Sequence, residues 1–346
     1  MENKEKTGKL LEVRDLHVSF FTPAGEVKAV GGISYDLNYD EVMGIVGESG
    51  SGKSVEAYSI IGLLQSPGKV IGGSITLEGE DMLAKTKEEM VALRGSKVAM
   101  IFQNPMTCLN PVYTIGNQLI EALKAHDKKV SKEDAAKRAM EMLELVGIHN
   151  PGQRLRQYPH QFSGGMRQRA MIATALACGP KLLIADEPTT ALDVTIQAQI
   201  IDLMKKMQQE MNAAILLITH DLGVVADIAK RICVMYSGKI VERGSAEDIF
   251  YRPRHPYTLA LLSAVPRMDL ENKQQLATIA GTPPDLLKPP AGCPFCTRCQ
   301  YCMPICREEM PPATGFGAGH EASCWLHDDR APKVDAPLYD EKEGRA

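Results

Sequence analysis

The sequence contains no long hydrophobic run. Its apolar stretches, such as residues 213–218, have the length of a buried strand and fall short of the roughly 18–20 residues of a membrane span. The first nine residues are polar, so we expect no secretory signal peptide. No repeat or compositional bias indicates a disordered or collagen-like chain. We therefore expect neither a secreted protein nor one that spans a membrane itself.

An excess of charge of one sign is also missing. Lys and Arg number 39 against 43 Asp and Glu, which gives a net charge of −4. A mildly acidic chain is poorly suited to non-specific binding of nucleic acids, and we expect no nucleic-acid partner. Apolar residues make up 44% of the 346 residues, which is enough for a sizeable core, and the length suggests about two domains.

Strand and helix patterns alternate along the chain. The periodicity predicts strands at 16–20, 33–37, 42–46, 182–185 and 214–218, and helices at 55–64, 115–123, 131–146, 167–177 and 195–211. Such alternation predicts an α/β fold with a parallel sheet whose loops gather at its carboxyl edge.

A phosphate-binding loop is predicted between the strand at 42–46 and the helix that follows it. Residues 47–54 read Gly-Glu-Ser-Gly-Ser-Gly-Lys-Ser, a full match to GxxxxGK[ST] in the context that the motif requires. Its backbone N–H groups and the helix N-terminus favour phosphate. The predicted nucleotide-binding residues are Gly47, Ser49, Gly50, Gly52, Lys53 and Ser54. Lys53 is expected to bind the β- and γ-phosphates, and the Ser54 hydroxyl to ligate Mg²⁺. A glycine turn with an incidental lysine is the plainer alternative.

Two adjacent carboxylates, Asp186 and Glu187, end the strand predicted at 182–185. Neighbouring strand residues point to opposite sides, so the two can act differently. We predict that Asp186 lies in the second shell of the Mg²⁺ ion and that Glu187 polarises an attacking water as a general base. Together with the phosphate loop, the pair predicts nucleotide hydrolysis.

The order of these motifs resembles the nucleotide-binding subunit of an ABC transporter. Between the loop and the carboxylates lies Ser163-Gly164-Gly165, which opens a predicted helix with Ser163 as its N-cap. Asp193 and His220 follow the carboxylates. The resemblance implies a P-loop NTPase of the ABC type at residues 1–250, with a helical subdomain inserted at about 105–165.

The resemblance also implies roles for single residues. Gln103 resembles the Q-loop glutamine that senses Mg²⁺ and the attacking water, and His220 resembles the switch histidine that contacts the γ-phosphate. Asp193 resembles the D-loop residue that crosses a dimer interface. Residues 163–165 are expected to contact the γ-phosphate of an ATP held by the other subunit. Phe20, next to another phenylalanine, is the candidate for stacking on adenine.

The C-terminal part narrows the resemblance. Residues 254–266 and 279–283, together with 102–111, resemble the ATPases of oligopeptide and dipeptide importers, and this likeness implies a C-terminal extension at 251–346. The implied partners are two transmembrane permease subunits docked on the helical subdomain, a second and paralogous ATPase subunit, and an extracytoplasmic peptide-binding protein. The implied location is peripheral, at the cytoplasmic face of the cell membrane.

Two other functions stay open at this point. Importers of nickel and other small solutes share these motifs. A soluble ABC-type ATPase acting on nucleic acid belongs to a different class, which the single cassette and the negative net charge disfavour.

Six of the nine cysteines fall between residues 293 and 324. An odd total without a signal peptide favours a metal or cluster site over a disulfide framework. In the importer group some members hold a [4Fe–4S] cluster on a C-x5-C-x6-C pattern with a later cysteine. The matching residues here are Cys293, Cys299, Cys306 and Cys324. Cys296 and Cys302 are interleaved with them, so a ferredoxin-like set of 293, 296 and 299 is also conceivable. Four-thiolate zinc and unmetallated thiols are the remaining alternatives.

Overall fold

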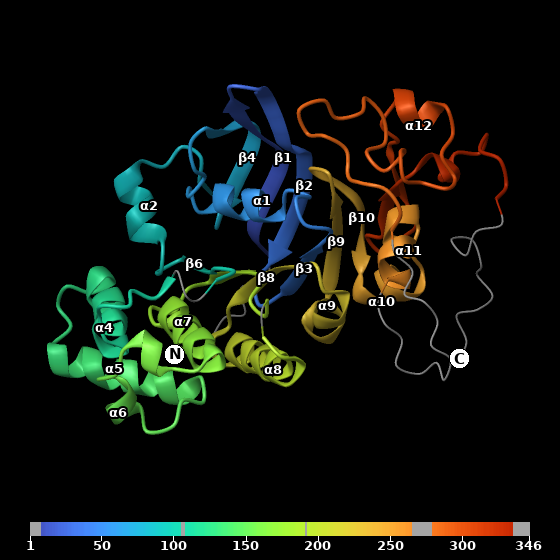
Figure 1. Cartoon of the computed structure of the whole chain (residues 1–346). Coiled ribbons are helices and arrows are strands. Elements are labelled where there is room, and N and C mark those ends of the chain that lie inside the picture. Colours follow the sequence, from blue (N-terminus) through green and yellow to red (C-terminus); the bar gives the residue numbers. More distant parts are fainter. Residues whose placement is uncertain (1–7, 105–107, 191, 265–278, 335–346) are drawn as a thin grey trace, which may run out of the picture. The chain divides into compact units, whose positions relative to one another are not determined.

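The structure is a computed structural model, and it describes residues 8–104, 108–190, 192–264 and 279–334 (Figure 1). The chain divides into two compact units that alternate along the sequence. The first unit comprises residues 1–11, 36–42 and 76–218, and the second comprises 12–35, 43–75 and 219–346. The predicted boundary between residues 250 and 251 is a different division of the chain and stays a prediction.

The first unit contains a buried parallel sheet. Its strands are β6 (Val98–Ile101), β7 (Leu182–Asp186) and β8 (Ala214–Thr219), with β7 between the other two. Every residue of the three strands is buried, as continuous apolar runs in a parallel sheet require. The strands predicted at 182–185 and 214–218 are therefore confirmed, and the carboxyl end of β7 carries Asp186.

The first unit also contains several helices. They are α2 (Lys87–Leu93), α4 (Ile115–His126), α5 (Lys132–Leu145), α6 (Pro151–Arg154), the 3₁₀ turn η1 (Pro159–Gln161), α7 (Gly164–Leu176) and α8 (Val194–Met211). Helices α4 and α5 pack on each other and on α7 (Figure 1). Thr114 and Ser131 cap α4 and α5 by accepting backbone N–H bonds, which fixes where the two predicted helices begin.

The second unit contains antiparallel and parallel pairing. Strands β1 (Lys9–Thr22), β2 (Gly25–Asn38) and β4 (Gly68–Leu77) are neighbours in the order β2-β1-β4, and the end of β4 pairs with β5 (Glu80–Asp81) within the first unit. Strand β3 (Val42–Val46) runs parallel to β9 (Arg231–Tyr236). Antiparallel pairing then continues from β9 to β10 (Lys239–Ser245), β12 (Glu321–Ser323) and β11 (Ala313–Gly315). The cysteine-rich tail thus adds strands to the sheet of its own unit.

The helices of the second unit are short. They are α1 (Lys53–Ile60), α9 (Leu222–Ile228), α10 (Ala246–Tyr251), α11 (Pro256–Ser263), α12 (Ile305–Glu308) and the 3₁₀ turn η2 (Trp325–His327). No helix in the described part of the chain is long and apolar enough to cross a membrane.

Three predicted helices have corrected ends. Helix α4 runs to His126, three residues past its predicted end at 123. Helix α1 starts at Lys53 and ends at Ile60 rather than near residue 64. The cause is a Schellman motif: Gly62 has φ +62°, its N–H donates to Ser59 O, and Leu63 N–H donates to Tyr58 O. Helix α7 begins at Gly164, three residues before the start that the periodicity predicted, and the predicted N-cap Ser163 is confirmed.

Candidate functional site

The phosphate loop connects β3 to α1 in the second unit, and two of its glycines are sterically required. Gly47 has φ +157° and Gly52 has φ +101°. A Cβ atom at Gly47 would collide with the carbonyl oxygen of Met235, and one at Gly52 with that of Ala29. The loop therefore lies flat against neighbouring backbone, and only glycine fits at these two positions.

Lys53 is buried within this loop. Its side chain is folded over the preceding residues: Nζ donates to Gly47 O at 2.7 Å and to Glu48 O at 2.9 Å. The residue is 4% exposed, whereas Ser49 and Gly50 are open to solvent. A positive charge is thus held at the centre of a loop whose tip is accessible, which is the arrangement that an anionic ligand requires.

The two carboxylates follow β7 in the first unit, and both are nearly buried. Asp186 is 1% exposed and Glu187 is 8% exposed. Glu187 has a left-handed backbone (φ +47°), and its N–H donates to Ile218 O at 2.8 Å. Strained backbone of this kind concentrates at functional sites.

Gln103 meets Glu187 within the same unit. Its Nε2 donates to Glu187 Oε2 at 2.7 Å across 84 residues of sequence. The Thr190 hydroxyl donates to the same oxygen at 2.9 Å. The carboxylate predicted to act as a base is therefore oriented by two donors, one of which is the predicted Q-loop glutamine.

Ser163 and Asp193 are both helix N-caps in the first unit. Ser163 Oγ accepts from Met166 N at 3.3 Å, and Asp193 Oδ1 accepts from Ile196 N at 2.9 Å. A Cβ at Gly165 would lie 3.1 Å from a side-chain carbon of Ile196, so the first turns of α7 and α8 are close together. Ser163, Gly164 and Asp193 are exposed, which leaves them available to another molecule.

His220 and the candidate aromatic belong to the second unit. His220 follows β8 directly and is exposed. Phe20 is half-buried, and a Cβ at Gly68 would lie 2.8 Å from its ring, which shows how closely it packs. Phe21 is 47% exposed, and Lys69 Nζ lies 5.9 Å from the centre of its ring. Stacking of Phe20 on adenine stays a prediction, with Phe21 as the more accessible ring.

Comparison with known protein families gives two matches along the chain. The ABC transporter family model matches residues 30–190. The family model for the oligopeptide/dipeptide transporter C-terminal region matches residues 241–306. The dipeptide transport ATP-binding protein of Bacillus subtilis is 55% identical over 93% of this chain and 96% of its own length. The chain belongs to the ATP-binding subunits of ABC transporters.

Other members of the family agree in sequence and in fold. The oligopeptide transport ATP-binding protein of Salmonella typhimurium is 52% identical over 91% of this chain and 93% of its own length. A solved dimer of an ATP-binding cassette with ADP and phosphate has a TM-score of 0.61 and 26% identity, covering 68% of this chain and 98% of that one. These neighbours confirm the predicted P-loop NTPase fold of the ABC type.

The tail of this ABC subunit gathers its cysteines. All six are free thiols, and five of them, Cys293, Cys296, Cys299, Cys306 and Cys324, line one pocket with Phe295 and Trp325. Cys302 is not among the residues that line it. Burial raises the pKa of Cys293 and of Cys324 to about 12 and that of Cys299 to about 11. Burial therefore disfavours the thiolates, and a bound metal would have to supply the positive charge that stabilises them.

The described residues give no support to a single-ion site, and the cluster stays a prediction. Tetrahedral zinc needs four thiolates about 2.3 Å from one point. Within the described residues, no three His, Cys, Asp or Glu side chains could hold one metal ion. The thiolates of a [4Fe–4S] cluster bind different iron atoms and stand farther apart. The four cysteines predicted as its ligands line the same pocket, together with Cys296.

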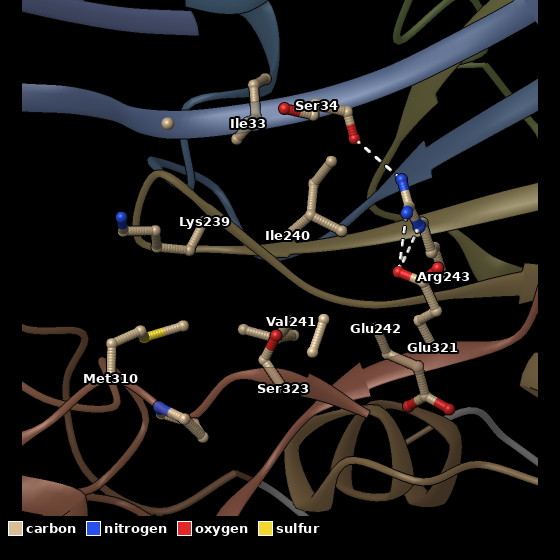
Figure 2. Close-up of a pocket in the computed structure, with 13 residues that line it drawn as sticks. Ile33, Ser34, Lys239, Ile240, Val241, Glu242, Arg243, Met310, Glu321 and Ser323 are labelled. Atoms are coloured by element: carbon tan, nitrogen blue, oxygen red, sulfur yellow. Dashed lines mark hydrogen bonds and ion pairs between the residues drawn. The ribbon is translucent and has the colours of Figure 1, made fainter. Parts of the chain in front are cut away.

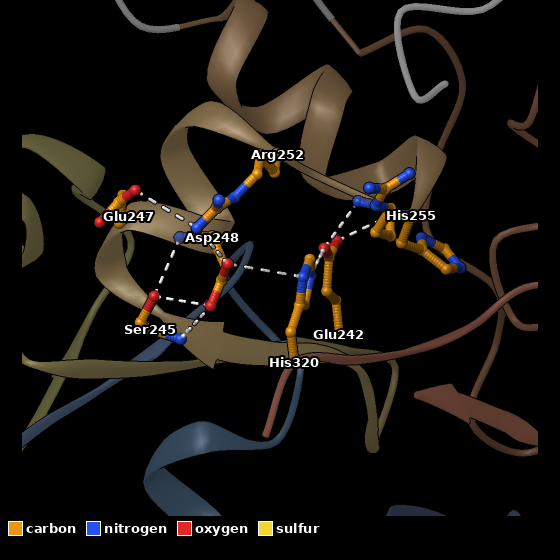
Figure 3. A network of polar contacts seen from close by, with 8 residues as sticks. Glu242, Ser245, Glu247, Asp248, Arg252, His255 and His320 are labelled. Atoms are coloured by element: carbon orange, nitrogen blue, oxygen red, sulfur yellow. Dashed lines mark hydrogen bonds and ion pairs between the residues drawn. The ribbon is translucent and has the colours of Figure 1, made fainter. Parts of the chain in front are cut away.

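A buried polar network anchors the tail to β10 (Figure 3). The Glu242 carboxylate accepts the N–H of Arg254 at 2.6 Å and that of His255 at 2.9 Å, and it lies 2.8 Å from His320 Nε2. Its side chain is fully buried. His320 Nδ1 lies 3.8 Å from Asp248. One carboxylate thus joins β10, the start of α11 and the loop before β12.

A solvent-open cavity of about 260 Å³ lies beside this network, between β2, β10 and the tail (Figure 2). Arg243 spans it, with two bonds to Glu321 Oε2 at 2.6 and 3.0 Å and one to Ser34 O at 3.1 Å. None of the residues predicted as sites lines this cavity. The cavity is therefore separate from the predicted ATP-binding residues.

Sequence reasoning missed several residues around the site. Thr190, which orients Glu187, stands three positions from it and has no motif of its own. Arg298 and Tyr257 contact Glu48, a variable position of the phosphate-loop motif. The 250 residues between Glu48 and Arg298 leave no local signal of this pairing.

Proposed function

We propose that this chain is the ATP-hydrolysing subunit that energises import of oligopeptides or dipeptides through a membrane ABC transporter. The observation that carries the proposal is the joint match of residues 30–190 to the ABC transporter model and of 241–306 to the C-terminal region of oligopeptide/dipeptide transporters. Relatives named as dipeptide and oligopeptide transport ATP-binding proteins, 55% and 52% identical, support the same substrates.

The residues have separate roles in this proposal. Lys53 and the loop N–H groups bind the β- and γ-phosphates, and the Ser54 hydroxyl ligates Mg²⁺. Asp186 and Gln103 help to hold that ion, and Glu187 takes the proton of the attacking water. The bonds from Gln103 and Thr190 support this role of Glu187, because they fix the carboxylate that must point at the water. His220 contacts the γ-phosphate.

Two such subunits act together in this proposal. The Ser163-Gly164-Gly165 segment at the start of α7, in which Ser163 and Gly164 are exposed, presents N–H groups and the positive end of the helix to the ATP of the other subunit. Asp193 crosses the interface. A similar cassette forms a dimer with ADP and phosphate, which supports this arrangement. The second subunit is proposed to be a paralogous ATPase.

Membrane subunits and a binding protein complete the proposed transporter. We propose that the chain sits peripherally at the cytoplasmic face and docks on two permease subunits. Helices α4 and α5, which pack on α7, are the proposed docking region. The substrate is delivered by an extracytoplasmic peptide-binding protein.

The test uses the purified complete complex in proteoliposomes. Binding protein loaded with peptide is expected to stimulate ATP hydrolysis and peptide uptake, and the same binding protein without peptide is the control. Stimulation only by a nickel-loaded or other solute-loaded binding protein would contradict the peptide assignment. Co-purification with nucleic acid rather than permease subunits would contradict the transport role itself.

We also propose that the tail holds a [4Fe–4S] cluster on Cys293, Cys299, Cys306 and Cys324. Their common apolar pocket supports this ligand set. When bound, the cluster would link four points of a proline-rich segment and so add stability that its small core cannot supply. Cys293 N–H donates to Cys306 O at 2.8 Å. This bond holds two of the proposed ligands close together although they lie in different segments of the chain.

Iron and acid-labile sulfide in anaerobically purified protein test the cluster. Near-equal amounts are expected, and Cys306→Ser and Cys324→Ser should lose both and destabilise the tail. Cys302→Ser, outside the pocket, is the matched control and should keep them, as should Cys296→Ser. The fluorescence of Trp325 should be quenched by the cluster and recover after its removal. Zinc without iron would contradict the cluster, and equal sensitivity of all six cysteines would contradict the ligand set.

A further inference from the structure

Glu48 is fixed by all three of its polar groups. Its N–H donates to the Tyr257 hydroxyl at 2.8 Å, and its carbonyl accepts from Lys53 Nζ at 2.9 Å. Its carboxylate is bound by Arg298. Glu48 is the second residue of the phosphate loop, yet two of these three partners come from the C-terminal part of the chain, and all belong to the same unit. The loop is therefore held from outside its own motif.

Arg298 binds that carboxylate, and every N–H donor of its guanidinium has an acceptor. Nη1 donates to Glu48 Oε2 at 2.6 Å and Nη2 to Oε1 at 3.0 Å, a bidentate pair. The other N–H groups donate to Ala280 O, Ile279 O and the Tyr236 hydroxyl, at 3.0 to 3.2 Å. All five donors are thus used, and the side chain is only 3% exposed. A guanidinium held this completely has one orientation.

Aromatic rings pack beside the Arg298 guanidinium. Tyr236, Tyr257 and Phe295 form a cluster with ring centres 4.5 to 5.3 Å apart. The Arg298 guanidinium carbon lies 5.8 Å from the Tyr236 ring and 5.9 Å from that of Phe295. The Arg298 side chain is 3% exposed and that of Glu48 26% exposed, so the pair is partly shielded from water, and loss of one partner leaves an unpaired charge beside apolar rings.

We propose that Arg298 is a positioning residue for ATP binding, acting through Glu48 on the phosphate loop. The bidentate ion pair fixes the phosphate loop beside Lys53. It also neutralises the Glu48 carboxylate, which lies within the segment that binds the triphosphate. Without Arg298, the Glu48 charge would oppose the phosphates and the loop would lose one of its three fixed points. This inference rests on the proposed assignment of residues 47–54 as the ATP site.

The experiment measures Mg-ATP affinity, KM and kcat for variants in the complete complex. Arg298→Met is expected to raise Kd and KM roughly tenfold, the loss typical of a hydrogen bond to a charged group, with kcat changed by less than about twofold. Arg298→Lys, which keeps the charge but not the bidentate ion pair, should give a smaller increase. Adding Glu48→Gln to Arg298→Met should lower KM again, because the orphaned carboxylate is gone.

Arg243→Met is the matched control. Arg243 also joins the tail to the rest of its unit, through Glu321, but it does not contact the phosphate loop. It should leave KM for ATP unchanged. Equal increases in KM for Arg298→Met and Arg243→Met, or no rescue by Glu48→Gln, would mean that Arg298 only anchors the tail, and would overturn the proposal.

Lys53→Ala separates this proposal from the one on which it rests. Normal ATP affinity in Lys53→Ala would refute the assignment of the loop as the ATP site. Lost affinity in Lys53→Ala together with normal affinity in Arg298→Met would refute only the positioning role. Folding of each variant is compared by thermal unfolding without nucleotide. If Arg298→Met does not fold, Glu48→Gln alone tests the contact between Glu48 and Arg298. Its amide oxygen still accepts from Arg298, but the bidentate ion pair is lost.

Discussion

Single residues at this site are held by more than one neighbour. Glu187 combines a left-handed backbone with two hydrogen bonds to one carboxylate oxygen, from Gln103 and Thr190. Lys53 is held by two carbonyl oxygens of its own loop. Such preorganisation lowers the reorganisation needed when charge develops during phosphoryl transfer.

Lys53→Ala should weaken ATP binding itself. The ammonium is the only lysine charge within residues 47–54, and its loss removes a charge-assisted bond to phosphate, so we expect roughly 10- to 100-fold weaker affinity. Equilibrium binding of Mg-ATP measures the effect. Lys206→Ala, on the exposed side of α8 with an ion pair to Glu210 at 3.7 Å, is the control and should bind normally. Unchanged affinity in Lys53→Ala would refute its phosphate role.

The residues within contiguous motifs could be predicted from the sequence, and their partners could not. The glycines at 47 and 52 follow from a loop whose backbone must approach other chain segments. Gln103 was predicted by resemblance, and the structure adds its bond to Glu187. Thr190 and Arg298 are chosen by tertiary contacts alone, so no spacing rule finds them.

At the scale of elements, the tail is attached to the sheet by β12 and by Glu242. Strand β12 pairs with β10, while Glu242 binds two backbone N–H groups before α11 and lies beside His320. Removing a buried carboxylate that has three partners is costly, because each donor would be left buried with neither an acceptor nor water to bond to. The tail should therefore unfold together with its unit.

Glu242→Gln should destabilise the protein by about 2 kcal/mol. The amide N–H₂ group would face N–H donors whose hydrogen bonds the carboxylate now accepts. The free energy of unfolding from denaturant titration measures the change. Glu247→Gln, whose side chain is 71% exposed, is the matched control and should stay within about 0.5 kcal/mol of wild type. Equal, small effects of the two substitutions would show that the network contributes little.

The sequence predicted elements best where the apolar period was long and the cap was clear. The strand at 42–46 matches β3, and the helix predicted at 195–211 matches α8 to within one residue. Strands β9, β10 and β12 were not predicted. Strands β9 and β10 form a local hairpin over Ser237 and Gly238, whose turn signal was overlooked, whereas β12 depends on pairing with β10 across the chain. The early end of α1 depends on the left-handed Gly62, which a periodic pattern does not encode.

At the scale of the whole molecule, the account requires two subunits for one reaction. The exposed N-terminus of α7, with its Ser163 cap already satisfied by Met166 N–H, leaves other N–H groups of the first turn available to a partner's nucleotide. A subunit by itself would then bind ATP with half of the groups needed for turnover. Coupling of hydrolysis to transport follows if closure of this dimer moves the permease.

Ser163→Arg tests this division in a dimer assembled from two differently marked copies of this chain, in place of the proposed paralogous pair. When a Ser163→Arg copy pairs with a Lys53→Ala copy, one composite site should be undamaged and hydrolysis should persist at about half. When both changes are on one copy and the other is wild type, no composite site is intact and hydrolysis should be lost. The reverse pattern of ATPase rates would show that each subunit completes its own site.

The most direct test of the central claim is the ATPase rate of Glu187→Gln in the complete complex. The substitution keeps the size of the side chain and removes the base, so ATP affinity should stay within about twofold while hydrolysis falls by roughly 100-fold or more. Glu210→Gln, on the exposed side of α8, is the control and should hydrolyse normally. ATP should hold the Glu187→Gln dimer closed and peptide uptake should stop. Hydrolysis and uptake near the wild-type rate would contradict the account.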